Sequence, residues 1–457
     1  MNSLPLIGLL ASVAAACFLP RLWVIALALS FAFMPFLRTE VPIGAVPIGV
    51  RPEDIMWLIL LGRTRAKEPE WLRGCSTDCK AFLRPYGVLI ILVLVYTIYS
   101  IIYYPPSSVS FYFLQKALGS TAMILVCLMN LTSWNRIRIG MAAILIGGTV
   151  LCVVISSSND TSYDVRPESG HQFDAEMYNI KNHSRALLVE WNPNSIGLAL
   201  GGCVFVAASL GTTCRRRVVK AFVLGAAGMF AVFTVTSYTR TAILGLGGSV
   251  LYTAVRRHGT RQTRGIALVA IALCGVTYST LARDPFNMDV GNDVNTGQRG
   301  AIWSAAVAAI MAQPMGYGAG AAELGMEEQT GKRWSAHNDW LDFALNLGVG
   351  GLVLTIYTFL SLAKLFRASS TKERSHRASA IIIEAFYAYL LICSFGLQVL
   401  LFTKQVFTIL SVVIAASSLR TVTRQSLGPQ YHSSLKWCAQ HAHCSCYLPA
   451  CEERPLL

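Results

Sequence analysis

Long uncharged apolar blocks are the feature of this sequence that most restricts its fold. The stretches LLASVAAACFL, VLIILVLVYTIY and AAILIGGTVLCVVI carry no charged side chain. Only 14% of the 457 residues are charged, whereas a soluble domain of this size carries about a quarter. A helix needs about 20 mostly apolar residues to cross a bilayer. The blocks therefore predict an all-α, polytopic integral membrane protein.

The apolar blocks predict about 12–13 transmembrane helices. We expect one transmembrane domain over residues 1–420, followed by a disordered cytoplasmic tail over residues 421–457. The tail is rich in cysteine and histidine, but their spacing matches no zinc pattern, so no metal site is expected. The predicted spans lie at residues 5–20, 22–37, 53–63, 86–104, 113–132, 138–155, 194–213, 219–237, 241–255, 265–282, 338–364, 380–401 and 405–419.

Lysine and arginine gather in the loops after alternate spans, most densely at residues 63–84 and 364–377. The positive-inside rule puts these loops in the cytoplasm. The net charge of +14 is thus explained by topology and does not indicate nucleic-acid binding. The outer side then holds two long loops, at 156–193 and 283–337, and we expect the second to carry short helices. Long loops of membrane proteins often carry function.

Two arginines on the outer side are candidates for binding an anion. Arg240 stands among hydroxyl side chains in VTSYTRTAILGLGG, although an arginine at a boundary can also simply snorkel to lipid headgroups. Arg299 precedes an amphipathic stretch that ends at Pro314 and is followed by GYGAG, with Gly318 in its middle. Guanidinium groups bind phosphate bidentately, and alternating glycines let backbone N–H groups approach an anion. A flexible turn gives the same glycine pattern.

A histidine and a polar stripe mark the point where the long outer loop meets the next predicted span. His337 is followed by Asp339, Asp342 and Asn346, which share one helical face by their spacing. Acidic residues on a membrane helix face the bundle interior or a wet cavity. A structural hydrogen bond is the alternative for the histidine alone, but the stripe favours a catalytic or binding role.

The other outer loop ends in EWNPNSIGLALGG, in which Asn192 and Asn194 flank a proline at a turn and helix start. Arg185, just before this turn, is a further candidate to line a binding site. An ordered loop cap explains these residues equally well.

The order of these motifs resembles the O-antigen ligase superfamily, which includes lipid A-core ligases, related O-antigen polymerases and bacterial protein O-glycosyltransferases. The resemblance is strongest over residues 190–355. Thr239 and Asn346 stand where that family often has serine and an acidic residue, which leaves the subfamily open. The matching residues are Asn192, Pro193, Asn194, Arg240, Arg299, Trp303, Pro314, Gly316, Gly318, Gly320, His337, Asn338, Leu341, Gly348 and Gly351.

The resemblance implies a glycosyltransferase of the bacterial inner membrane with its site at the periplasmic face. It implies an undecaprenyl-diphosphate-linked glycan donor, a lipid A-core or similar acceptor, and neither metal nor other cofactor. By carry-over, Arg240, Arg299 and His337 are the expected catalytic residues. The arginines would stabilise the diphosphate leaving group, and the histidine would act as general base or phosphate ligand. The expected substrate-binding residues are Arg185, Asn192, Asn194, Trp303, Gly318, Asn338, Asp339 and Asp342.

Three other functions can be weighed against the sequence. A polymerase that extends the lipid-linked glycan differs from a ligase only in its acceptor, and no residue reports the acceptor. A polysaccharide transporter would show internal repeats and charges near the middle of several spans, and the sequence shows neither. A non-catalytic scaffold would not need the arginines and histidine.

Overall fold

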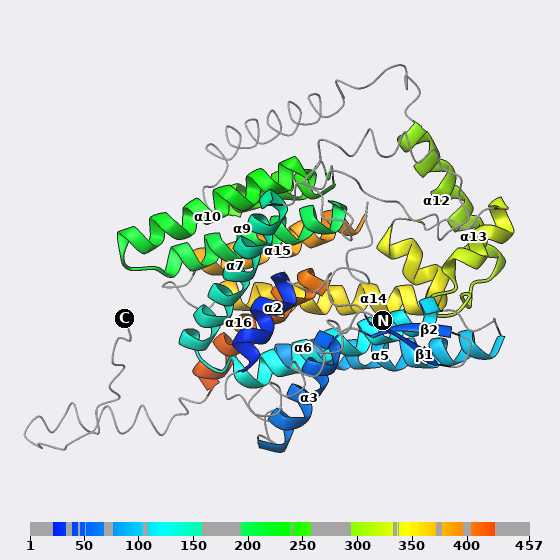
Figure 1. Cartoon of the computed structure of the whole chain (residues 1–457), viewed down its shortest axis with the longest axis horizontal. Helices are drawn as coiled ribbons and strands as arrows, with labels where there is room; N and C mark the ends of the chain where they lie inside the picture. Colours follow the sequence, from blue (N-terminus) through cyan, green and yellow to red (C-terminus); the bar gives the residue numbers. More distant parts are fainter. Residues whose placement is uncertain are drawn as a thin grey trace, which may run out of the picture.

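A computed structural model describes the following parts of the chain: residues 22–32, 39–43, 46–50, 52–67, 76–103, 108–157, 193–237, 239, 241–256, 294–331, 336, 338–371, 377–395 and 404–425. Within these ranges every regular element is a helix except for one hairpin, which confirms the predicted all-α class (Figure 1). Predicted spans 5–20 and 265–282 lie outside the described residues.

Six of the described helices are long and apolar enough to cross a membrane. They are α5 (Thr77–Tyr103), α6 (Ser108–Asn130), α7 (Trp134–Ser157), α9 (Pro193–Thr213), α10 (Arg217–Thr236) and α14 (Asp339–Thr371). The remaining helices are α2 (Leu22–Ala32), α3 (Pro52–Lys67), one over residues 241–256, α12 (Val294–Ala312), α13 (Ala322–Thr330), α15 (Arg377–Ser394) and α16 (Lys404–Gln425).

The hairpin lies in the Pro- and Gly-rich segment that precedes α3. Strand β1 (Thr39–Ile43) pairs antiparallel with β2 (Val46–Val50), and Thr39 lies opposite Val50. No strand was predicted here. The segments TEVPI and VPIGV carry β-branched residues that favour strands, but they are too short to show a clear alternating pattern.

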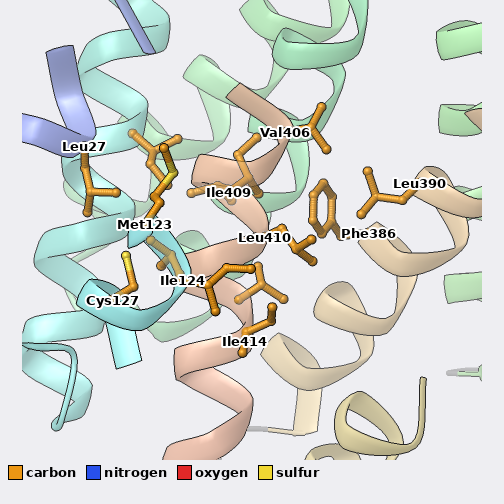
Figure 2. Packing of buried hydrophobic residues seen from close by; sticks show 14 of the residues in the cluster. Leu27, Met123, Ile124, Cys127, Phe386, Leu390, Val406, Ile409, Leu410 and Ile414 are labelled. Carbon is orange, nitrogen blue, oxygen red and sulfur yellow. The ribbon is translucent and has the colours of Figure 1, made fainter. Parts of the chain in front are cut away.

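The helices pack into one bundle with the two helices of the long loop at its end. In Figure 1, α5, α6 and α14 run side by side, while α9, α10 and α15 form a neighbouring group. Helices α12 and α13 lie beyond the first turns of α14, so the predicted long loop does carry short helices. Figure 2 shows α16 in the centre of the core, where Ile409 and Leu410 pack between Met123 of α6 and Phe386 of α15.

Small residues let α15 approach its neighbours closely. The Tyr389 hydroxyl donates to the carbonyl of Leu198 in α9 at 3.0 Å. A side chain at Gly201 would meet the Tyr389 ring, and one at Gly245 would lie 2.7 Å from the Cys393 sulfur. Small residues at helix contacts are typical of membrane bundles, where close backbone approach replaces the hydrophobic effect. This packing brings α9, α15 and the helix over 241–256 together below the candidate site.

Candidate functional site

A buried polar row begins α14. Asn338, Asp339, Asp342 and Asn346 are each at most 6% exposed, which confirms that this predicted stripe faces the protein interior. The Asn338 side-chain oxygen accepts a hydrogen bond from the Trp340 backbone N–H at 3.0 Å, so it caps the helix. The cap holds the row in place at the end of the long loop.

The two carboxyl groups of the row lie in the first turn of α14. The partial positive charge at a helix N-terminus stabilises anions there, which offsets part of the cost of burying Asp339 and Asp342. Both also interact with other groups of the protein. At this position a carboxylate can accept hydrogen bonds from sugar hydroxyls or orient a nearby guanidinium group.

Helix α14 is broken two residues after Asn346, the last residue of the polar row. Gly348 has φ 70° and ψ −179°, a backbone conformation accessible essentially only to glycine. The break separates the Leu345 carbonyl from the Val349 N–H, which would be its partner in a regular α-helix. The Leu345 carbonyl accepts instead from the N–H of Tyr317 at 2.7 Å, and the Val349 N–H donates to the Pro314 carbonyl at 2.9 Å. In a membrane, irregular backbone is tolerated only when other protein groups satisfy it in this way.

The loop that fills this break is the glycine-rich segment after α12. The Gly316 N–H donates to Gln313 O at 2.9 Å, and the Gly318 N–H donates to Asn346 O at 3.1 Å. The Gly320 N–H donates to the Asn346 side-chain oxygen at 2.7 Å. The expectation that these N–H groups face an anion is therefore wrong for this structure. The glycines have φ values between 81° and 104°; the lack of a side chain lets Gly316 lie against α14 and Gly318 lie against α5.

Helix α12 contacts the segment that holds the candidate histidine. The Trp303 indole N–H donates to the carbonyl of Ala336, the residue before His337, at 3.1 Å. Arg299 lies one helical turn before Trp303 in α12, so the i, i+4 spacing puts both residues on one helical face. The predicted substrate-binding Trp303 is thus engaged with the backbone beside His337.

The residues around Arg240 pack against the start of α9. Ser237 and Thr239 are at most 1% exposed, and the Ser237 hydroxyl donates to the Thr239 hydroxyl at 3.0 Å. A side chain at Gly197 would meet both hydroxyl groups. The first turn of α9, which contains the half-buried Asn194, therefore lies beside the segment that leads into Arg240.

The last turn of α15 contacts the segments that carry Arg240 and His337. The Cys393 thiol donates to the carbonyl of Thr241, the residue after Arg240, at 3.5 Å. The Asn338 side-chain amide, which follows His337, donates to the carbonyl of Phe395 at 3.1 Å. The rings of Trp340 and Phe395 are 5.8 Å apart. One end of α15 therefore contacts both the residue after Arg240 and the residue after His337.

Several predicted site residues lie outside the described residues. They are Arg185, Asn192, Arg240, His337 and the side chain of Arg299. Among the residues that the structure does describe, no three His, Cys, Asp or Glu side chains are grouped to hold a metal ion.

The end of α15 was not among the predicted site residues. Cys393 and Phe395 carry no charge and lay inside a predicted apolar span, so nothing in their identity suggested a contact with the polar segments. The pair Gly197 and Gly201 could have predicted that another helix packs closely here, because small residues four apart on a membrane helix indicate such packing.

Residues 224–356 match the family model of the O-antigen ligase. The match confirms the resemblance to the O-antigen ligase superfamily. It includes Arg240, Arg299, Trp303, His337 and the polar row of α14, whereas the Asn-Pro-Asn turn at the start of α9 precedes it. No curated protein matches the chain.

Proposed function

We propose that this membrane protein, whose residues 224–356 belong to the O-antigen ligase superfamily, transfers a glycan from undecaprenyl diphosphate to a lipid A-core or similar acceptor. The observation that carries the proposal is the convergence of three segments. The end of α15 contacts Thr241 and Asn338, and Trp303 contacts Ala336. Consecutive Cα atoms are about 3.8 Å apart, so these contacts support a common site for the neighbouring Arg240 and His337.

Arg299 joins this site through α12. It shares a helical face with Trp303, which contacts the segment before His337. Two guanidinium groups can bind the two phosphates of a diphosphate through paired hydrogen bonds. At a low-dielectric boundary such contacts stabilise developing charge far better than they would in water.

The proposed reaction breaks the bond between the anomeric carbon and the diphosphate oxygen and forms a bond from that carbon to an acceptor hydroxyl. The leaving group is undecaprenyl diphosphate, and Arg240 and Arg299 stabilise the negative charge that it gains. His337 takes the proton of the acceptor hydroxyl, a role that suits a group whose pKa lies near neutral pH. In an alternative assignment His337 holds a phosphate oxygen. Asp339 and Asp342 bind hydroxyl groups of the sugars.

The site is proposed to face the periplasm, and the whole transmembrane domain to lie in the inner membrane. The support is the excess of lysine and arginine in the loops at the other end of the helices. After removal of the native cysteines, a cysteine at Gln329, which is exposed at the end of α13, should react with a membrane-impermeant reagent in intact cells. A cysteine at Arg73 serves as the cytoplasmic control. Labelling of position 329 only in opened cells would reverse the proposed topology.

A reconstituted reaction tests the function itself. The purified full chain is given undecaprenyl-diphosphate-linked glycan and lipid A-core, and the products are identified by mass. A ligase yields glycan-bearing lipid A-core and free undecaprenyl diphosphate. A polymerase, the second candidate from the same family, yields longer lipid-linked glycan and no modified core. Absence of both products from a correctly folded protein would refute the proposed activity.

A further inference from the structure

A cavity with charged residues in its lining lies at the far end of α14. This cavity of about 620 Å³ opens between α5, α14 and α15, and its lining includes Asp78, Leu360, Lys364, Arg367 and Tyr387. These positions on α14 are some 20 residues beyond the polar row, which corresponds to roughly 30 Å of helix, about the thickness of a bilayer core. The cavity therefore belongs to the membrane face opposite the candidate functional site.

The charges of the lining favour an anionic ligand. Lys364 and Arg367 are both exposed and, three residues apart, lie on one face of α14. Asp78 is the only carboxylate among the lining residues, and it lies in the first turn of α5, where the helix N-terminus stabilises its charge. The positive balance suits a phosphate, which arginine binds through its planar fork and lysine binds as a point charge.

The wall of the cavity is fixed by aromatic contacts. The Tyr387 hydroxyl donates to the Phe359 carbonyl at 3.1 Å, and its ring meets Phe366 edge-on at 6.0 Å. A cation that only snorkels toward lipid headgroups needs no such concave surface. The cavity is open on one side, and its volume lies within the range of small-molecule sites, about 300–1,000 Å³.

An apolar strip leads from the bilayer centre to the cations. Val353, Tyr357 and Leu360 are 59%, 57% and 62% exposed, and their spacing puts them on the same face of α14 as Lys364. Exposed apolar side chains on a membrane helix are covered by lipid chains. A ligand that fits both parts has an acyl chain along this strip and a phosphate at its end.

We propose that this cavity binds the headgroup of an anionic phospholipid, with one acyl chain lying along the α14 strip. Lys364 and Arg367 hold the phosphate, and the Tyr387 ring forms the wall against which the glycerol lies. The basic residues after α14 put this end of the helix in the cytoplasmic leaflet. The lipid would brace α5, α14 and α15 from the side opposite the site of glycan transfer.

The test uses the full chain purified in detergent, with phosphatidylglycerol as the probe and lipid retention in native mass spectrometry as the readout. Each basic residue near an anionic headgroup contributes about a fivefold gain in binding, so Lys364→Gln/Arg367→Gln should weaken phosphatidylglycerol binding about thirtyfold. The matched control is Arg216→Gln/Lys220→Gln, which removes two exposed cations from the same predicted side but outside the cavity. Its binding should stay close to that of the unmodified chain.

A third variant should bind phosphatidylglycerol more tightly, a result that misfolding cannot produce. Asp78→Asn removes the one carboxylate of the lining and should tighten phosphatidylglycerol binding about fivefold. Equal weakening in the cavity and control variants, or equal retention of phosphatidylcholine, would overturn the proposal. Complete displacement of the lipid by inorganic phosphate would show that the cavity is a site for a free anion and not for a lipid.

Discussion

Replacing Gly348 by alanine tests whether the broken α14 and the glycine-rich loop form one structural unit. The residue has φ 70°, so any side chain there adopts a strained backbone at a cost of about 1–3 kcal/mol. An added Cβ would also lie 2.6 Å from the Met315 carbonyl oxygen and 2.7 Å from that of Pro314. Backbone atoms cannot yield cheaply at such distances, so the loop has to move.

Movement of the loop breaks the hydrogen bonds that satisfy the interrupted helix. The bonds from Val349 N to Pro314 O and from Tyr317 N to Leu345 O each contribute about 1 kcal/mol. Together with the backbone strain, the expected loss of stability is about 3–5 kcal/mol. Because the same turns of α14 carry Asp342 and Asn346, glycan transfer should fall with stability.

The assay compares thermal unfolding in detergent and glycan transfer for Gly348→Ala and Gly350→Ala. Gly350 is two residues further along the same helix, and an added Cβ there would meet nothing within 4 Å. Alanine is the better helix former by about 0.8–1.0 kcal/mol, so Gly350→Ala should be neutral or slightly stabilising. Equal melting temperatures and equal transfer rates for the two variants would refute the role given to the break.

Three further outcomes are expected. Trp303→Phe keeps an aromatic ring but loses the N–H that donates to the Ala336 carbonyl, so the rate of glycan transfer should fall about fivefold without a matching fall in melting temperature. A parallel fall in rate and melting temperature would indicate a purely structural role. Arg256→Gln leaves Glu384, which is 3% exposed and which Arg256 contacts at 3.1 Å, without its cation. It should destabilise the fold by about 1–3 kcal/mol, and adding Glu384→Gln should restore most of the loss in thermal unfolding. Truncation after Ser426 should leave transfer intact, and loss of transfer in a truncated protein that still inserts would contradict this.

The membrane fold could be predicted from the sequence because apolar block length is a local property. The blocks that became α5, α7 and α10 are long, strongly apolar and nearly free of charge, so their identity depends on no distant residue. The hairpin of β1 and β2 was not predicted, because two strands of five residues each are too short to show an alternating pattern of apolar and polar residues.

The site could be predicted only in its residue types. Asp339 and Asp342 were expected to face inward, because a carboxylate on a membrane helix is too costly to expose to lipid. Both are buried in the structure. The role of Gly318 was not predictable, because its N–H is used by a carbonyl of α14 that becomes available only when that helix breaks. The contact of Cys393 with Thr241 depends likewise on how α15 packs, which no local pattern encodes.

The proposed mechanism requires that Arg240, Arg299 and His337 surround one donor diphosphate. The most direct measurement is the rate of glycan transfer from purified lipid-linked donor to acceptor, with chelator present, for the alanine variant of each residue. Each variant should lose about a hundredfold or more in rate, and lysine at either arginine position should restore only part, because it keeps the charge but not the fork. His183→Ala, a histidine of the other outer loop, should stay near the unmodified rate. Full activity in all three alanine variants, or an absolute need for added metal, would contradict this mechanism.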